Sequence, residues 1–136
     1  MKDAAEYLAQ VKALIVMNPQ VEHWKAAREE EQGDVGLFRY KLVLRDGGLI
    51  ELFELFQVAQ ESVKVMKYSF HWQDVTGELR IRWDNAPHHL EVPTHPHHVH
   101  DGSEANVLPH APITVEEVLG ILQQQVVAKP GPESVT

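Results

Sequence analysis

The sequence predicts an α+β fold: an N-terminal helix, a four- to five-stranded antiparallel meander sheet, a loop rich in histidine and proline, and a C-terminal helix. Two amphipathic segments near the ends of the chain and four alternating segments between them support this prediction, and residues 84–112 have no periodicity. With 136 residues, one domain is expected at 1–129, followed by a flexible tail at 130–136.

The first predicted element is a helix that ends at Asn18-Pro19. Asp3 followed by Glu6 is a pattern that caps a helix N-terminus. Apolar side chains then recur at helical spacing: Leu8, Val11, Leu14 and Ile15. Residues 21–28 are weakly patterned and are interpreted as a first edge strand, and residues 29–34 are expected to form a solvated turn.

Four segments between residues 37 and 83 are predicted to be strands. Apolar and polar side chains alternate within residues 37–45, 49–58, 63–72 and 79–83. The sequences Asp46-Gly47-Gly48 and Asp74-Val75-Thr76-Gly77 indicate tight turns. Consecutive strands joined by short turns predict an antiparallel meander.

The segment 84–112 contains five prolines, a density that disfavours a helix or a central strand. It is therefore expected to be a long loop, of the kind that is usually functional or disordered. Thr114-Val115-Glu116-Glu117 then matches a capping box. The helix that follows is expected to end near Lys129-Pro130.

Composition excludes several classes of protein. The absence of cysteine excludes disulfides, thiolate zinc sites, iron–sulfur clusters and a cysteine nucleophile. The longest apolar run, Ala13–Met17, is too short to cross a membrane. The N-terminus does not look like a signal peptide, so a cytoplasmic location is expected. The net charge of −8 disfavours non-specific nucleic-acid binding, although basic residues gather between 37 and 83.

Histidine is the clearest sign of chemistry in the sequence. Seven of the nine histidines lie between His71 and His100. Histidine transfers protons near neutral pH and is also the commonest metal ligand. The alternative is that these side chains only pack and hydrogen-bond an irregular loop.

A metal site is one interpretation of the cluster. Asp84, His88, His98 and His100 are the candidate ligands, but their spacing matches no defined zinc pattern. The sequence leaves two alternatives for the cofactor: a divalent metal ion, or no cofactor at all.

General acid–base catalysis is the other interpretation, and it needs two groups in different protonation states. Two histidines, or one histidine with Asp84 or Glu54, would supply them, and Arg82 or Lys67 would stabilise a developing anion. The catalytic candidates are Glu54, His71, Arg82, Asp84, His88, His89, His97, His98 and His100; the candidate substrate-binding residues are Lys67, Tyr68 and Asn85.

Glu54 is a candidate because alternation places it on an apolar face with Leu52 and Phe56. A buried carboxylate has a raised pKa, which suits a catalytic base. The alternative is an edge-strand glutamate that reaches solvent.

Three motifs resemble the TumE-like family of bacterial toxins. They are the stretch 67–73, KYSFHWQ, then RWDNAPHH at 82–89, and PHHVH at 96–100. The resemblance covers roughly residues 35–122 and implies the toxin half of a type II toxin–antitoxin operon. It also implies a partner, an antitoxin with a helix-turn-helix DNA-binding domain encoded beside the toxin. The family pattern usually has lysine where this chain has Val99, so a phosphate contact made by that lysine would be altered here.

The residues and the resemblance together predict a toxin that acts on nucleic acid, with RNA cleavage by acid–base histidines as the leading hypothesis. Its site would be the Asp84–His100 loop, above the strand face that bears Lys67, His71 and Arg82. A metal-dependent hydrolase and a non-catalytic toxin that occupies a host target are the alternatives. RNA or DNA is a possible substrate, and a homodimer is possible.

Overall fold

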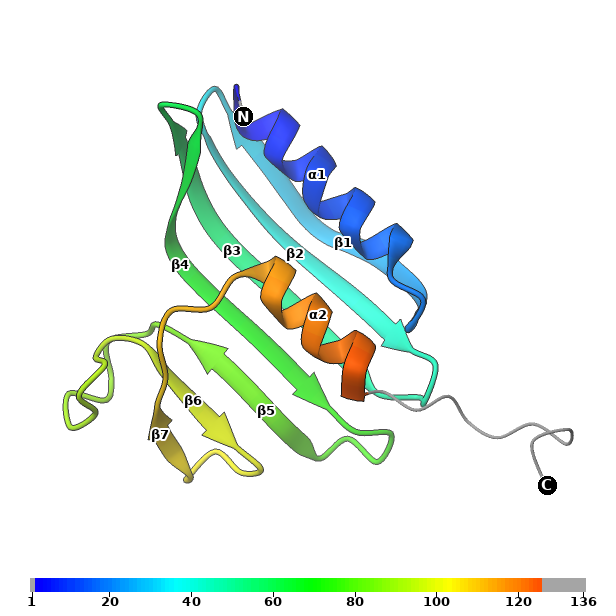
Figure 1. Ribbon diagram of the computed structural model, residues 1–136, viewed down its shortest axis with the longest axis vertical. Helices are drawn as coiled ribbons and strands as arrows, with labels where there is room; N and C mark the ends of the chain where they lie inside the picture. Colours follow the sequence, from blue (N-terminus) through cyan, green and yellow to red (C-terminus); the bar gives the residue numbers. More distant parts are fainter. Residues whose placement is uncertain (1, 126–136) are drawn as a thin grey trace, which may run out of the picture.

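The computed structural model describes residues 2–125, in which two helices lie on one face of a seven-stranded sheet (Figure 1). The elements in chain order are α1 Ala4–Met17, β1 Val21–Gln32, β2 Val35–Leu44, β3 Leu49–Ala59, β4 Ser62–Gln73, β5 Leu79–Asp84, β6 His98–Asp101, β7 Val107–Pro109 and α2 Val115–Gln125. The strands follow the same order in the sheet, and each is antiparallel to the next. The α+β meander is confirmed.

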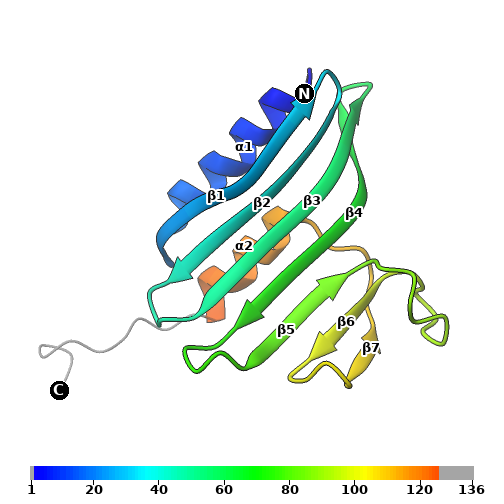
Figure 2. The same cartoon turned by 180° about the vertical axis from the view of Figure 1, so that it is seen from behind.

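Alternation within the central strands separates two faces of the sheet. In β2 and β3 the even-numbered side chains are buried against the helices, among them Phe38, Tyr40, Leu52 and Phe56. Their odd-numbered neighbours lie on the opposite face, here called the open face. Figure 2 shows this face with both helices behind the sheet.

Both helices pack on the sheet through apolar stripes, are capped at their first turns, and are joined to each other by a hydrogen bond. The Asp3 carboxylate accepts a hydrogen bond from the Glu6 backbone N–H at 2.9 Å, as the capping pattern predicted. The Asn18 side chain, at the end of α1, donates to the Leu119 carbonyl of α2 at 2.9 Å. Thr114 and Glu117 form the predicted capping box of α2.

The N-terminal part of the sheet corrects one prediction. Residues 29–32 are not a turn: they continue β1 and pair with residues 35–38 of β2. β1 is an edge strand whose side chains are mostly exposed, so charged residues can occupy it without desolvation. The turn itself contracts to Gly33-Asp34.

The segment 84–112 corrects a second prediction, because it contains β6 and β7 and raises the number of strands to seven. β6 pairs with β5, and β7 pairs with β6 as the outermost strand. Pro109 is tolerated at the end of β7 because an edge strand leaves backbone donors unused. The predicted tail at 130–136 and the predicted helix end near Lys129 lie outside the described residues.

Candidate functional site

The candidate site lies on the open face where β5 pairs with β6. The register sets Arg82 opposite His100 and Asp84 opposite His98, so these four side chains share one face. His89, from the turn that follows β5, covers the pair of histidines. A rigid two-stranded platform and one loop residue therefore build the site.

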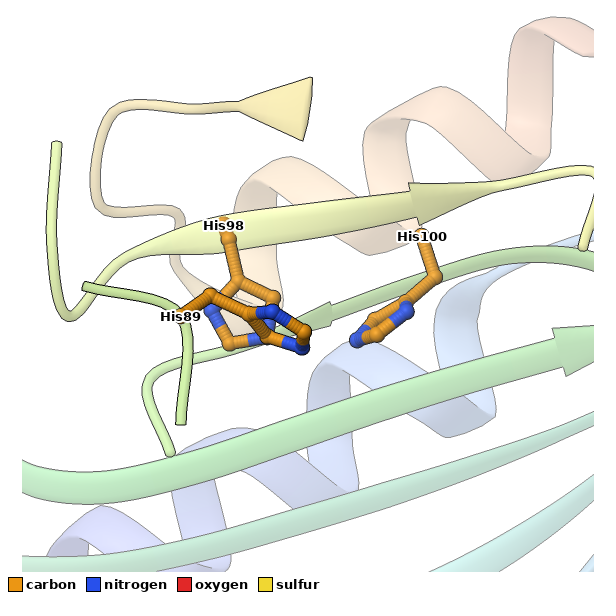
Figure 3. Close-up of side chains that lie close together, drawn as sticks. All are labelled: His89, His98 and His100. Atoms are coloured by element: carbon orange, nitrogen blue, oxygen red, sulfur yellow. The ribbon is translucent and has the colours of Figure 1, made fainter. Parts of the chain in front are cut away.

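His89, His98 and His100 form the histidine cluster (Figure 3). Their ring centroids lie 4.8 to 5.5 Å apart, and one ring nitrogen from each lies within 4.8 Å of the others. The side chains of His98 and His100 are only 1% and 3% exposed, whereas that of His89 is 29% exposed. The cluster is thus buried at its base and open at His89.

Each imidazole of the cluster is oriented by a hydrogen bond at Nδ1. His98 Nδ1 lies 2.8 Å from the Pro96 carbonyl, and His100 Nδ1 lies 2.8 Å from the Glu104 carbonyl. His89 Nδ1 lies 2.9 Å from a carboxylate oxygen of Glu91. Because these oxygens only accept, each Nδ1 carries the proton. The three Nε2 atoms are therefore left to face other partners.

Asp84 meets two of these Nε2 atoms. Its carboxylate oxygens lie 2.9 Å from His98 Nε2 and 3.6 Å from His100 Nε2. Since His98 already donates through Nδ1, a close contact between its Nε2 and a carboxylate requires a second ring proton or a cation between the two atoms. The geometry therefore calls for positive charge at this point.

Arg82 contacts both Asp84 and His100 of the site. Its Nε donates to Asp84 at 3.0 Å, and its Nη2 lies 3.0 Å from His100 Nε2. The guanidinium also pairs with Glu104 at 2.8 Å. Arg82 is thus held beside the cluster by two carboxylates and a ring nitrogen.

The donor set fits a divalent transition-metal ion. Three neutral imidazoles and one carboxylate are a ligand set suited to Zn²⁺ and related ions. Metal-binding histidines usually donate the other ring N–H to a carbonyl or carboxylate, as all three do here. A tetrahedral ion holds its ligand atoms ~3.3 Å apart, so binding would draw together the nitrogens that now span up to 4.8 Å.

His71 and Lys67 lie on the same face as the cluster. His71 in β4 is the cross-strand partner of Arg82, as the sequence-based interpretation required, and Lys67 lies further along the same strand. Asn85 has a different position. Its side chain accepts from the Tyr68 N–H at 3.0 Å and donates to the Met66 carbonyl at 3.2 Å, which fixes the end of β5 against β4.

Tyr68 and His97 are not brought to the cluster. Tyr68 is 4% exposed on the helix-covered face, and its hydroxyl lies 2.9 Å from His97 Nδ1. Burial, together with the Asp84 carboxylate, raises the pKa of Tyr68 to about 12. Burial and the nearby His98 lower the pKa of His97. The alternation of β4 separates Tyr68 from Lys67 and His71 by the thickness of the sheet.

Glu54 is also on the helix-covered face, in a central strand and 1% exposed. The Tyr7 hydroxyl of α1 donates to its Oε1 at 2.6 Å, while Oε2 has no hydrogen-bond partner among the described residues. Burial raises the pKa of Glu54 to about 7, against the opposing effect of the Tyr7 hydrogen bond. The structure therefore separates Glu54 from the histidine cluster, and the edge-strand alternative is wrong.

Glu54 predicts a pH dependence of stability. Its raised pKa means that the folded chain binds more protons than the unfolded chain between the ordinary glutamate value and pH 7, so the free energy of unfolding falls as pH rises through that interval. Glu54→Gln is expected to remove this fall and to raise the free energy of unfolding at pH 8 by about 3 kcal/mol. Urea unfolding at pH 5 and pH 8 measures both effects. An unchanged pH dependence in Glu54→Gln, or an equal change in the exposed Glu31→Gln variant, would contradict the assignment.

His88 and Val99 lie outside the cluster. His88 is exposed on the turn after β5, and its neighbour His89 takes the place that the metal interpretation gave to His88. Val99 is 5% exposed and packs in the core, because alternation points it away from His98 and His100. The position that usually carries lysine in the resembled family therefore does not face the cluster in this chain.

Glu91 and Glu104 were not identified from the sequence. Glu91 orients His89 from two residues further along, a spacing that could have signalled the contact. The carbonyl of Glu104 orients His100 across a turn, and its carboxylate pairs with Arg82. No pattern in the sequence marks that second role.

Fold and site together define a class: a small antiparallel α+β domain with a histidine–carboxylate centre on the uncovered face of its sheet. The model of one protein family, described as Toxin TumE, matches residues 11–127. The chain belongs to this toxin family. No curated protein and no solved structure matches it. Among residues 2–125, no helix is long and apolar enough to span a membrane.

Proposed function

We propose that this toxin is a ribonuclease whose cleavage centre is a divalent metal ion bound by His89, His98, His100 and Asp84. The observation that carries the proposal is the common orientation of the three imidazoles, each with Nδ1 hydrogen-bonded to an oxygen. This arrangement brings one ring nitrogen of each histidine together beside one carboxylate, where a bound ion would replace the contacts of His98 Nε2 with Asp84 and of His100 Nε2 with Arg82. It is the arrangement expected of metal ligands.

Burial favours the metal interpretation over direct acid–base catalysis by the cluster. A histidine that transfers protons to a substrate must reach it, yet the side chains of His98 and His100 are only 1% and 3% exposed. A buried ligand is no obstacle to metal binding, since an ion held by these four side chains would accept a substrate oxygen at a fifth coordination position. That position would lie on the His89 side, where the cluster is open.

The neighbouring residues suit hydrolysis of a phosphodiester. A bound metal ion would polarise a phosphoryl oxygen and favour deprotonation of a water molecule. The water oxygen attacks phosphorus, the bond to the leaving oxygen breaks, and that oxygen receives a proton. Arg82 would stabilise the added negative charge, and the partly exposed His71 beside it would donate the proton.

We also infer a protein partner. The chain belongs to a toxin family, and a toxin that cleaves RNA must be neutralised in the cell that makes it. The partner that the sequence motifs favour is an antitoxin with a helix-turn-helix DNA-binding domain, encoded beside the toxin. Co-purification of the two products of that operon is the direct check.

The activity is tested with the untagged full-length protein and total RNA. We expect cleavage in the presence of Zn²⁺ or Mn²⁺, its loss with a chelator, and its recovery when the metal ion is restored. Gel analysis of the RNA, beside a parallel reaction with DNA, provides the measurement.

Three other results would each overturn part of the proposal. Cleavage that resists the chelator would assign the reaction to metal-free acid–base histidines. Cleavage of DNA but not RNA would change the substrate. Growth inhibition by a protein that leaves RNA and DNA intact would instead indicate a toxin that acts by binding a host target.

A further inference from the structure

Two rows of cross-strand partners lie on the open face of the sheet and end at the histidine cluster; Figure 2 shows the strands of this face. Each row consists of cross-strand partners, so its members share one face. The first row is Lys25, Lys41, Glu51, His71, Arg82 and His100; the second row is Arg28, Arg39, Phe53, Ser69, Asp84 and His98.

The rows are basic although the chain is acidic. They contain five lysine or arginine side chains and two carboxylates, within a chain of net charge −8. Two of the cations oppose one another, since Lys25 lies directly across from Lys41; Arg28 lies across from Arg39, but each of these arginines pairs with a glutamate, Glu30 and Glu51 respectively. Like charges in directly opposite positions destabilise a sheet. An anion that bridges the two strands would relieve this repulsion.

A depression lies over the β1–β4 part of the first row. Its volume is about 360 Å³, and Lys25, Lys41, Glu51 and His71 contribute to its lining together with the apolar Leu49. The Glu51 carboxylate is partly neutralised, since it pairs with Arg39 and lies 4.0 Å from Lys41 Nζ. Cationic and apolar surfaces in one hollow suit a group that is both anionic and flat.

The second row adds an aromatic surface beside this depression. Phe53 is partly exposed, with the Arg39 guanidinium carbon 4.6 Å and Lys67 Nζ 5.9 Å from its ring centroid. Aromatic rings interleaved with cations are the usual means of binding single-stranded nucleic acid, because bases stack and phosphates pair with the cations.

We propose that the open face binds a single-stranded nucleic acid that runs across the strands, from the depression at Lys25 and Lys41 to the histidine cluster. The proposal rests on the proposed function, and it adds a binding site for the nucleotides that flank the bond to be cut. Five steps between strands span ~24 Å, a distance sufficient for several nucleotides. Unpaired bases are required because only they can enter a hollow or stack on Phe53.

Binding is measured by fluorescence anisotropy with labelled 12-nucleotide single strands of RNA and of DNA, and with a duplex. The protein is the full chain carrying His89→Ala, with chelator present, and a gel confirms that each oligonucleotide stays intact. The test variant adds Lys25→Ala and Lys41→Ala. The matched control instead adds Lys2→Ala and Lys12→Ala, which remove the same charge at α1 and the residues before it, on the helix side of the sheet.

We expect the Lys25→Ala/Lys41→Ala protein to bind single strands about tenfold more weakly. The slope of log K against the logarithm of the salt concentration should become shallower by about 1.4. The control should stay within twofold. Equal losses in both variants, no loss in the test variant, tighter binding of the duplex, or no binding of any strand would each overturn the proposal. RNA cleavage that is unchanged in the Lys25→Ala/Lys41→Ala variant would contradict the proposed binding site on the open face but not the ribonuclease activity. If single strands bind in a way that depends on Lys25 and Lys41, but the unsubstituted protein does not cleave RNA, only the proposed ribonuclease activity would be contradicted.

Discussion

The His89→Ala variant is expected to lose at least about a hundredfold in affinity for a divalent metal ion, together with RNA cleavage and growth inhibition. His89 is the exposed wall of the cluster, with its Nε2 aimed at the same point as those of His98 and His100. Removing it opens a coordination position that no neighbouring side chain replaces among residues 2–125. Because the side chain is partly exposed, the fold should survive.

His88→Ala is the matched control for this prediction. His88 is the adjacent histidine, it is exposed, and it lies outside the cluster. Titration of the chelator-treated proteins with Zn²⁺, thermal unfolding and growth of expressing cells measure the three properties. Equal behaviour of His89→Ala and His88→Ala would show that the cluster does not hold the functional ion.

Phe70→Ala is expected to lower the free energy of unfolding by about 3–5 kcal/mol. Phe70 is fully buried at the centre of the sheet, faces the helices and stacks on Tyr68 with ring centroids 5.2 Å apart. Its cross-strand partners are Leu52 and Trp83, also buried. The substitution leaves a cavity that this close packing cannot fill.

The control for Phe70→Ala is Phe53→Ala, since Phe53 lies on the adjacent strand but on the open face. Because the Phe53 ring is partly exposed, Phe53→Ala should lower the free energy of unfolding, measured with denaturant, by less than half as much as Phe70→Ala. Similar losses for the two variants would contradict the assignment of the faces.

The central strands could be predicted because one of their faces is buried and the other is not. Alternation from Leu37 to Trp83 put Glu54 on the apolar face, with an exposed edge strand as the alternative, and put His71 on the opposite face. The structure buries Glu54 and pairs His71 with Arg82. The strands β6 and β7 escaped prediction, and β1 was predicted only as an edge strand over residues 21–28. β1 is an exposed edge whose charged residues show no apolar face. β7 has only three residues, and β6 is a four-residue strand whose polar side chains His98 and His100 are themselves buried beneath His89.

The sequence predicted which types of residue form the candidate site better than it predicted which individual histidines take part. The motif at 82–89 identified Arg82 and Asp84, but a turn after β5 decides which of His88 and His89 points inward, and the sequence does not reveal that choice. Similarly, the separation of Tyr68 and His97 from the cluster depends on which side of the sheet each occupies. The contact between Glu54 and Tyr7 joins positions 47 residues apart, which no local pattern records.

The central claim is that the histidine cluster binds a divalent metal ion, and the metal content of the untagged protein tests it most directly. Elemental analysis after purification without chelator should find about one equivalent of a transition-metal ion per chain, and none in the His89→Ala variant. Equal metal content in the two proteins, or a chelator-treated protein that fails to bind Zn²⁺ while it remains folded and toxic, would contradict the account.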